Sequence, residues 1–167
     1  SSVRRTALSG TDSETSMRIL LVDDDPVALE IGRAMVRALG HEVIAAADGL
    51  SAIRAVEEES PDFVLLDFVM PGIDGVEVAN RIRAMRPNTW LPIVFMSGLD
   101  GEANVVRLMR AGGEDFLRKP LNRDILAGRL RGYARVVGIQ RELEAKNREL
   151  ERYKQHMEEE KRVARHL

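Results

Sequence analysis

Five short apolar runs alternate with helix-like segments between residues 17 and 118, and this alternation limits the possible folds most strongly. Short apolar runs bounded by turn residues are typical of buried strands. Strands that alternate with helices favour a parallel sheet with right-handed crossovers and helices on both faces. We therefore predict a doubly wound α/β domain whose five strands are Met17–Val22, His41–Ala46, Asp62–Leu66, Leu91–Met96 and Asp115–Arg118.

Capping and breaking residues mark the ends of the predicted helices. Asp25 stands directly before Pro26, which is a helix-start signature, and Gly40 follows the last apolar residue of that helix. Pro87 ends the third helix, because proline cannot continue a helical hydrogen-bond pattern. A fourth helix is expected from about Gly101 to Ala111.

Four of the five predicted strands end in polar residues that suit a chemical site. Asp23 and Asp24 follow the first strand, Asp67 the third, Ser97 the fourth and Lys119 the fifth. The carboxyl ends of parallel strands share one edge of the sheet, where open α/β folds bind ligands, so these side chains are expected to meet. Taken alone, Asp67 has a simpler interpretation as the cap of a turn, and Lys119 as a surface lysine.

Three carboxylates held at one edge would repel one another, so the cluster calls for a cation. Mg²⁺ suits it, because this ion prefers oxygen ligands and binds one or two carboxylates together with waters and phosphate oxygens. The lysine and the hydroxyl supply donors for an anion. The sequence therefore predicts a site that holds Mg²⁺ and a phosphoryl group together, with a carboxylate as the covalent acceptor.

Four motifs stand in order at the predicted strand ends: Val22-Asp23-Asp24-Asp25-Pro26, Leu65-Leu66-Asp67 through Gly75, Met96-Ser97-Gly98 and Lys119-Pro120. Over residues 17–137 they resemble the receiver domain of bacterial two-component response regulators. The resemblance implies a flavodoxin-like sheet with the strand order 2-1-3-4-5. It also implies a partner that is a sensor histidine kinase or a phosphotransfer protein.

The same resemblance assigns the acidic residues their roles. Asp67 would accept the phosphoryl group from a phosphohistidine of the partner. Asp24, Asp67 and the backbone carbonyl of Val69 would ligate Mg²⁺ directly, and Asp23 would act through water. Because the metal neutralises charge on the transferred group, its loss is expected to abolish the transfer.

The resemblance places Ser97 and Lys119 on the phosphoryl oxygens and implies a cis peptide bond between Lys119 and Pro120. Phe116 falls where the family keeps an aromatic residue, often tyrosine, that swings inward when the serine is drawn to the phosphate. Phenylalanine lacks the hydroxyl group, so a switch at this position would rest on packing alone. Simple core packing of Phe116 is the alternative.

Position 69 departs from the family pattern. Many members place a polar side chain two residues after the acceptor, where it guides the attacking water, whereas this chain has Val69. We therefore predict slow loss of the phosphoryl group. Asp74 and Gly75, later in the same loop, are expected only to start the next helix.

Composition excludes several other classes of protein. The formal net charge of −2 gives no argument for a nucleic-acid partner. The chain has no cysteine, which excludes disulfides and thiolate chemistry, and no apolar run approaches the roughly 18 residues that cross a bilayer. We expect a cytoplasmic protein without membrane contact, in which residues 1–16 are a disordered leader or an expression remnant.

Near residue 136 a heptad repeat begins. Its a positions hold Val136, Leu143, Leu150, Met157 and Ala164, and its d positions hold Ile139, Lys146, Tyr153, Glu160 and Leu167. In a parallel pair, Glu149 at position g would face Lys154 at position e of the other chain. Residues 138–167 are therefore predicted to be a coiled-coil signalling helix, with a homodimer formed through Val136–Leu167. A single solvated helix is the alternative, because two d positions are charged.

The last helix of the domain carries a second apolar stripe, out of phase with the heptad seam, formed by Leu126, Leu130, Tyr133 and Val137. The two stripes meet near Gly138, which suggests a stutter or a hinge. The end of the chain resembles linkers that lead into phosphatases of the metal-dependent serine/threonine class. We therefore expect an output domain outside this chain.

Two other functions stay open beside the leading prediction of a non-enzymatic phosphoacceptor switch. A Mg²⁺-dependent phosphatase with an aspartyl nucleophile would use the same carboxylates. Such enzymes commonly carry a second acid two residues after the nucleophile, where this chain has Val69. The third possibility is a dimerisation module that does not depend on phosphorylation.

Overall fold

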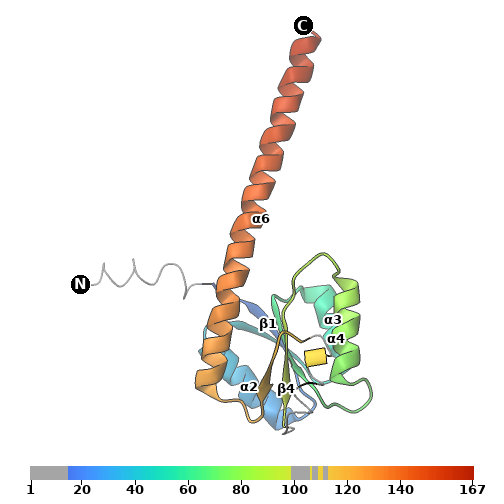
Figure 1. The fold of residues 1–167 in the computed structure, drawn as a ribbon, viewed down its shortest axis with the longest axis vertical. Coiled ribbons are helices and arrows are strands. Elements are labelled where there is room, and N and C mark those ends of the chain that lie inside the picture. Colours follow the sequence, from blue (N-terminus) through green and yellow to red (C-terminus); the bar gives the residue numbers. More distant parts are fainter. Residues whose placement is uncertain (1–14, 99–105, 107–108, 111–112) are drawn as a thin grey trace, which may run out of the picture.

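The computed structural model of the chain describes residues 15–98, 106, 109–110 and 113–167 (Figure 1). Five parallel strands form one sheet in the order β2-β1-β3-β4-β5. The predicted fold class and strand order are confirmed. The strands are β1 (Arg18–Val22), β2 (Glu42–Ala46), β3 (Phe63–Asp67), β4 (Ile93–Ser97) and β5 (Asp115–Arg118).

Helices cover both faces of this sheet. They are α2 (Pro26–Ala38), α3 (Gly49–Glu59), α4 (Gly75–Met85) and α6 (Arg123–Arg165). The helix expected from about Gly101 to Ala111 lies largely outside the described residues; residues 106, 109 and 110 are described and are helical.

Alternate residues of each central strand point to opposite faces, and each face has its own core. Leu20, Val64 and Phe95 belong to the core beneath α3 and α4. Ile19, Phe63 and Val94 belong to the core beneath α2 and α6. Because both faces are covered, β3 and β4 are buried along their whole length, which explains why each is apolar up to its last residue.

The capping residues act as the sequence indicates. The carboxylate of Asp25 accepts a hydrogen bond from the Val27 N–H at 3.0 Å, and that of Asp74 accepts one from the Glu77 N–H at 2.9 Å. Each bond satisfies a donor that the first turn of a helix leaves free. Asp74 thereby fixes where the loop after β3 ends.

α6 is one uninterrupted helix of 43 residues that passes through Gly138 without a break. A hinge that breaks the helix near Gly138 is therefore absent from α6, whereas a stutter, which needs no break, stays a prediction. No break is needed, because the two apolar stripes lie on different sides of the helix: Leu130 and Val137 are buried against the sheet, whereas Ile139 and Leu143 are exposed. The predicted boundary at residue 137 falls inside α6.

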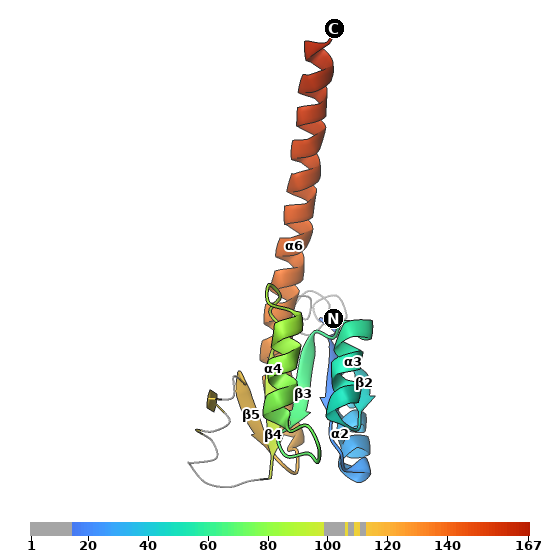
Figure 2. The same ribbon diagram turned by 90° about the vertical axis from the view of Figure 1, so that its right-hand side faces the viewer.

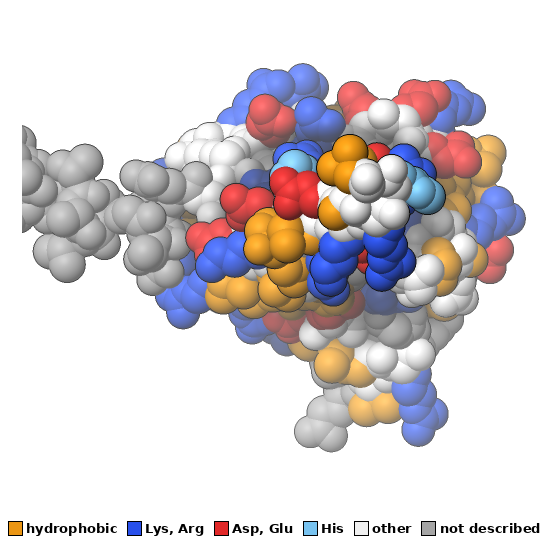
Figure 3. Space-filling view, turned by 90° about the horizontal axis from the view of Figure 1, so that it is seen from above, with side chains coloured by type: hydrophobic (Ala, Val, Ile, Leu, Met, Phe, Trp, Pro, Cys, Tyr) orange, Lys and Arg blue, Asp and Glu red, His pale blue; other side chains and the backbone are white. Residues whose placement is uncertain are grey.

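The second half of α6 projects beyond the amino end of the sheet and away from the domain (Figure 1 and Figure 2). Leu143 and Leu150 are 58% and 52% exposed, so no other described residue of the chain covers the heptad seam at these positions. Figure 3 looks onto this end of the molecule and shows hydrophobic side chains on the surface among charged ones. Among the described helices, none is long and apolar enough to span a membrane.

Candidate functional site

The predicted acids, the serine and the lysine of the site lie at the carboxyl edge of the sheet, whereas Phe116 lies within β5. Asp23 directly follows β1, Asp67 is the last residue of β3, Ser97 is the last residue of β4, and Lys119 directly follows β5. Backbone bonds fix these ends: the Asp23 N–H donates to the Ala46 carbonyl at 3.1 Å. The strand register therefore brings together side chains that are far apart in the sequence.

Three carboxylates form a compact acidic cluster. One carboxylate oxygen from each of Asp23, Asp24 and Asp67 lies within 4.8 Å of the others. Asp23 and Asp67 are 2% and 4% exposed, whereas Asp24 is open to solvent. The Asp25 N–H donates to Asp23 Oδ1 at 3.0 Å, which orients that carboxylate.

Lys119 lies against two members of the acidic cluster. Its Nζ atom is 2.7 Å from Asp23 Oδ2 and 3.3 Å from Asp67 Oδ2. Burial lowers the pKa of Lys119, but its bonds and charge attraction to Asp23 and Asp67 outweigh that effect, so the pKa is raised. Lys119 is charged at neutral pH and is shared between two acids, unlike an isolated surface lysine.

The surroundings of Asp67 shift the pKa of its carboxyl group. Burial raises its pKa to about 6, and the charge of Asp23 adds to the rise. Lys119 opposes the shift, as does the hydrogen bond that the Val69 N–H donates to Asp67 Oδ1 at 3.3 Å. Asp67 therefore sits in a place where its negative charge is incompletely balanced.

The composition of this cluster fits a divalent cation. When all groups are ionised, three carboxylates face one ammonium group, which leaves an excess of two negative charges. The donors are hard carboxylate oxygens, and the exposed position of Asp24 leaves one side open to water. Asp23, Asp24 and Asp67 thus supply what a Mg²⁺ site requires.

Ser97 and Phe116 lie on the two strands beyond Asp67. Ser97 is 2% exposed, and its carbonyl accepts a hydrogen bond from the Lys119 N–H at 2.8 Å. The Lys119–Pro120 peptide bond is cis, as the resemblance implies. Phe116 is partly buried and packs against the core under α3 and α4. This packing fits the core interpretation of Phe116, and its role as a switch stays a prediction.

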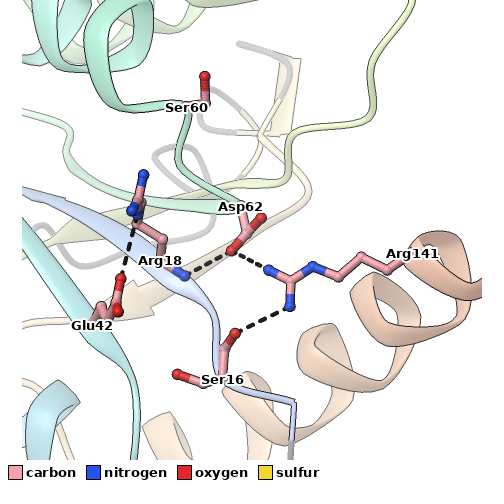
Figure 4. A pocket seen from close by; sticks show the side chains of 6 residues that line it. All are labelled: Ser16, Arg18, Glu42, Ser60, Asp62 and Arg141. Carbon is pink, nitrogen blue, oxygen red and sulfur yellow. Dashed lines mark hydrogen bonds and ion pairs between the residues drawn. The ribbon is translucent and has the colours of Figure 1, made fainter. Parts of the chain in front are cut away.

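Sequence reasoning missed a polar group at the opposite end of the sheet. Ser16, Arg18, Glu42, Ser60, Asp62 and Arg141 line a cavity of about 350 Å³ there (Figure 4). Arg141 of α6 donates to Asp62 at 2.6 Å and to the Ser16 carbonyl at 3.2 Å. No sequence pattern predicts the ion pair between Asp62 and Arg141, because the two residues lie far apart in the chain.

Comparisons with known proteins agree with the fold. Residues 19–131 match the family model described as the response regulator receiver domain. The probable transcriptional regulatory protein TcrX of Mycobacterium tuberculosis is 33% identical over 121 residues, which are 72% of this chain and 51% of TcrX. Response regulator PleD of Caulobacter vibrioides is 33% identical over 138 residues, which are 81% of this chain and 30% of PleD. The chain thus spans about half of TcrX and less of PleD.

A solved structure adds a metal to the comparison. The receiver domain of the sensor histidine kinase PA1611 from Pseudomonas aeruginosa, described with a magnesium ion in its active-site cleft, is similar with a TM-score of 0.65. The sequence identity is 33%, and the match covers 71% of this chain and 98% of that one. The family model matches residues 19–131, which make up most of this chain. The chain therefore belongs to the response regulator receiver domain family, whose members act in two-component signalling.

Proposed function

We propose that the protein is a phosphoacceptor switch in which Asp67 receives a phosphoryl group from a sensor histidine kinase or a phosphotransfer protein. The observation that carries this proposal is the surroundings of Asp67. Its carboxylate is buried at the end of β3, beside two further acids and one shared lysine. A nucleophile, a cation site and an anion-binding donor within one cluster are what phosphoryl transfer to a carboxylate requires.

In the proposed transfer, an oxygen of the Asp67 carboxylate attacks phosphorus and forms a new P–O bond. The P–N bond to the donor imidazole breaks, and its electron pair stays on the imidazole nitrogen. Mg²⁺ held by Asp23, Asp24 and Asp67, with the Val69 carbonyl as a further ligand, would neutralise charge on the transferred group. Lys119 and Ser97 would hold the phosphoryl oxygens after transfer.

Acetyl phosphate offers a test without the partner kinase. The chain is expected to gain the mass of one phosphoryl group when incubated with acetyl phosphate and Mg²⁺, and to gain none when EDTA removes the metal. Intact-protein mass spectrometry measures both results. An unmodified chain in the presence of Mg²⁺ would favour a dimerisation module that does not depend on phosphorylation.

Val69 is proposed to prolong the phosphorylated state. Its side chain is 58% exposed next to the acceptor, and it cannot position a water molecule by hydrogen bonding. Phospho-Asp67 is therefore expected to decay several-fold more slowly in the parent chain than in a Val69→Asn variant. The decay is followed by mass spectrometry after removal of the phosphodonor, and a parent that decays as fast as the variant contradicts this role.

The exposed heptad seam supports a parallel homodimer through Val136–Leu167. Leu143, Leu150 and Tyr153 are all more than half exposed on one chain, which leaves an apolar stripe for a second copy to cover. We propose that this coiled coil relays the state of Asp67 to an output domain beyond these 167 residues. The class of that domain, including the phosphatase class to which the linker bears a resemblance, stays a prediction, as does the cytoplasmic location.

Val69 also argues against a phosphatase that uses Asp67 as its nucleophile. An aspartyl phosphatase needs a proton donor near the leaving group, and the side chain two residues after Asp67 is an exposed valine. Turnover of a small phosphoester, measured as released phosphate, would support the phosphatase instead.

A further inference from the structure

α6 presents two different faces over the same short segment, residues 136–144. On one face, Val137 is buried against the sheet, and Arg141 bonds to Asp62 and Ser16. On the other face, Ile139 and Leu143 are exposed members of the heptad seam. Residues two apart in an α-helix lie about 160° apart around its axis, so the face that touches the domain lies opposite the seam.

The heptad positions of these residues also place the domain-facing side of α6 opposite the seam. Counted from Val136 at position a, three of the four buried residues of α6 fall on outer positions: Leu130 and Val137 at position b and Ala134 at position f. The fourth, Leu126, falls at position e and lies before the heptad seam begins. Arg141 is also at position f. Positions b, c and f form the outer surface of a two-stranded coiled coil, while a and d form its interior. The domain therefore occupies the outer surface of α6 and leaves the interior positions open.

Asp62, which directly precedes β3, connects α6 to the start of β1. Its carboxylate accepts from Arg141 at 2.6 Å and from the Arg18 N–H at 2.7 Å, so one acid joins α6 to the start of β1 (Figure 4). Arg141 uses its other terminal nitrogen for the Ser16 carbonyl. Within the described part of the chain, these are the last hydrogen bonds that α6 makes with the rest of the domain.

We propose that Asp62 and Arg141 form a latch that holds each receiver on the outside of a dimeric coiled coil, so that the helices pair from Ile139 onward. The proposal rests on the dimer proposed above. The partner that covers the heptad seam is a second copy of the chain, because Glu149 and Lys154 carry the complementary charges that parallel pairing requires. The two receivers would then flank the coiled coil, each covering only its own helix.

The latch itself is tested without reference to dimerisation or phosphorylation. Amide hydrogen exchange of residues 138–144 is expected to rise about fivefold in Arg141→Ala, which corresponds to about 1 kcal/mol, and to rise less in Asp62→Asn, whose uncharged oxygen can still accept from Arg141. Asparagine retains an acceptor for the Arg18 N–H, so the start of β1 is preserved. Arg141→Lys is expected to give an intermediate rise, because lysine keeps the charge but cannot donate in the same forked geometry.

Arg148→Ala is the matched control. Arg148 is the same residue type at the same heptad position, one heptad further along the exposed part of α6. If Arg141→Ala and Arg148→Ala leave the exchange of residues 138–144 alike, the latch is overturned.

The placement of the receivers is tested by disulfide formation, since the chain has no cysteine of its own. The single cysteine of Leu150→Cys and that of Ile139→Cys are each expected to form a disulfide bond between two chains. The single cysteine of Arg148→Cys, on the outer surface, is expected to form none. A link at Leu150→Cys but not at Ile139→Cys overturns the outer placement of the receivers. Failure at Leu150→Cys refutes the dimer itself, which is a separate result.

Discussion

A chain in which Asp67 is replaced by asparagine is expected to gain no phosphoryl group from acetyl phosphate and Mg²⁺. The amide has no negatively charged oxygen to attack phosphorus, and it removes one of the three carboxylates of the acidic cluster. The loss should be complete, because Asp67 is the group that we propose forms the new bond. Intact-protein mass spectrometry of the parent and the variant, treated side by side, measures it.

Asp74→Asn is the control for this substitution. Asp74 lies in the loop after the acceptor, and its carboxylate caps α4 through the Glu77 N–H. Asparagine caps a helix about as well as aspartate, so this variant should fold and take up the phosphoryl group like the parent. A phosphoryl mass on Asp67→Asn would place the acceptor elsewhere in the chain.

Asp67→Asn should also raise the stability of the metal-free chain. Burial raises the pKa of Asp67 from 3.8 to about 6 in the folded state, so ionisation between pH 4 and 7 disfavours folding. At about pH 3, below both pKa values, the carboxyl group is largely neutral in both states, and the advantage of asparagine disappears. Urea unfolding at pH 3 and pH 7 in EDTA measures this difference and shows that the variant folds, independently of its lost phosphoryl uptake.

Gly75→Ala is expected to lower the free energy of unfolding by about 1–3 kcal/mol, the usual effect of forcing an extra methyl group into a packed site. A Cβ atom at this position would lie 2.7 Å from the Asp67 carbonyl oxygen and 2.9 Å from the Phe68 Cα atom. Both neighbours are backbone atoms, so the loop that carries the acceptor must move. We therefore expect slower phosphoryl uptake together with lower stability.

Gly128→Ala separates this crowding from the general effect of replacing glycine. Gly128 lies within α6, and a Cβ atom there has no neighbour within 4 Å. Alanine is favoured over glycine inside a helix by roughly 1 kcal/mol, so this variant should be more stable than the parent. Urea unfolding measures both variants. A Gly75→Ala chain that is as stable as the parent would show that the acceptor loop adjusts without strain.

The sequence predicted the carboxyl edge of the sheet well because each of its residues stands at the end of an apolar run. Asp67, Ser97 and Lys119 could be placed together once the runs were taken as parallel strands. The carboxyl ends of β3 and β4 moved by one residue, since Asp67 and Ser97 are the last residues of their strands and not the first residues of loops. A polar residue at a strand end still takes part in the backbone hydrogen bonds of the sheet. A prediction from apolar runs ends the strand one residue too early, because it stops at the first polar residue.

The opposite edge could not be predicted. The bond between Asp62 and Arg141 joins residues 79 positions apart, and neither residue stands out in the sequence. Ser16, assigned by composition to a leader, accepts a hydrogen bond from Arg141 through its carbonyl, which any residue type could provide. The out-of-phase stripes were visible in the sequence, but their meaning depended on knowing which side of α6 faces the sheet.

The uninterrupted course of α6 has a mechanical consequence. From Arg141 to Arg165 the helix extends about 36 Å at 1.5 Å per residue, with little contact to the domain. Such a rod works as a lever whose fulcrum is Asp62: a tilt of about 10° at that point carries its far end about 6 Å, more than the rise of one helical turn. Small rearrangements inside the receiver would therefore arrive at the end of the helix as displacements large enough to change which surfaces meet.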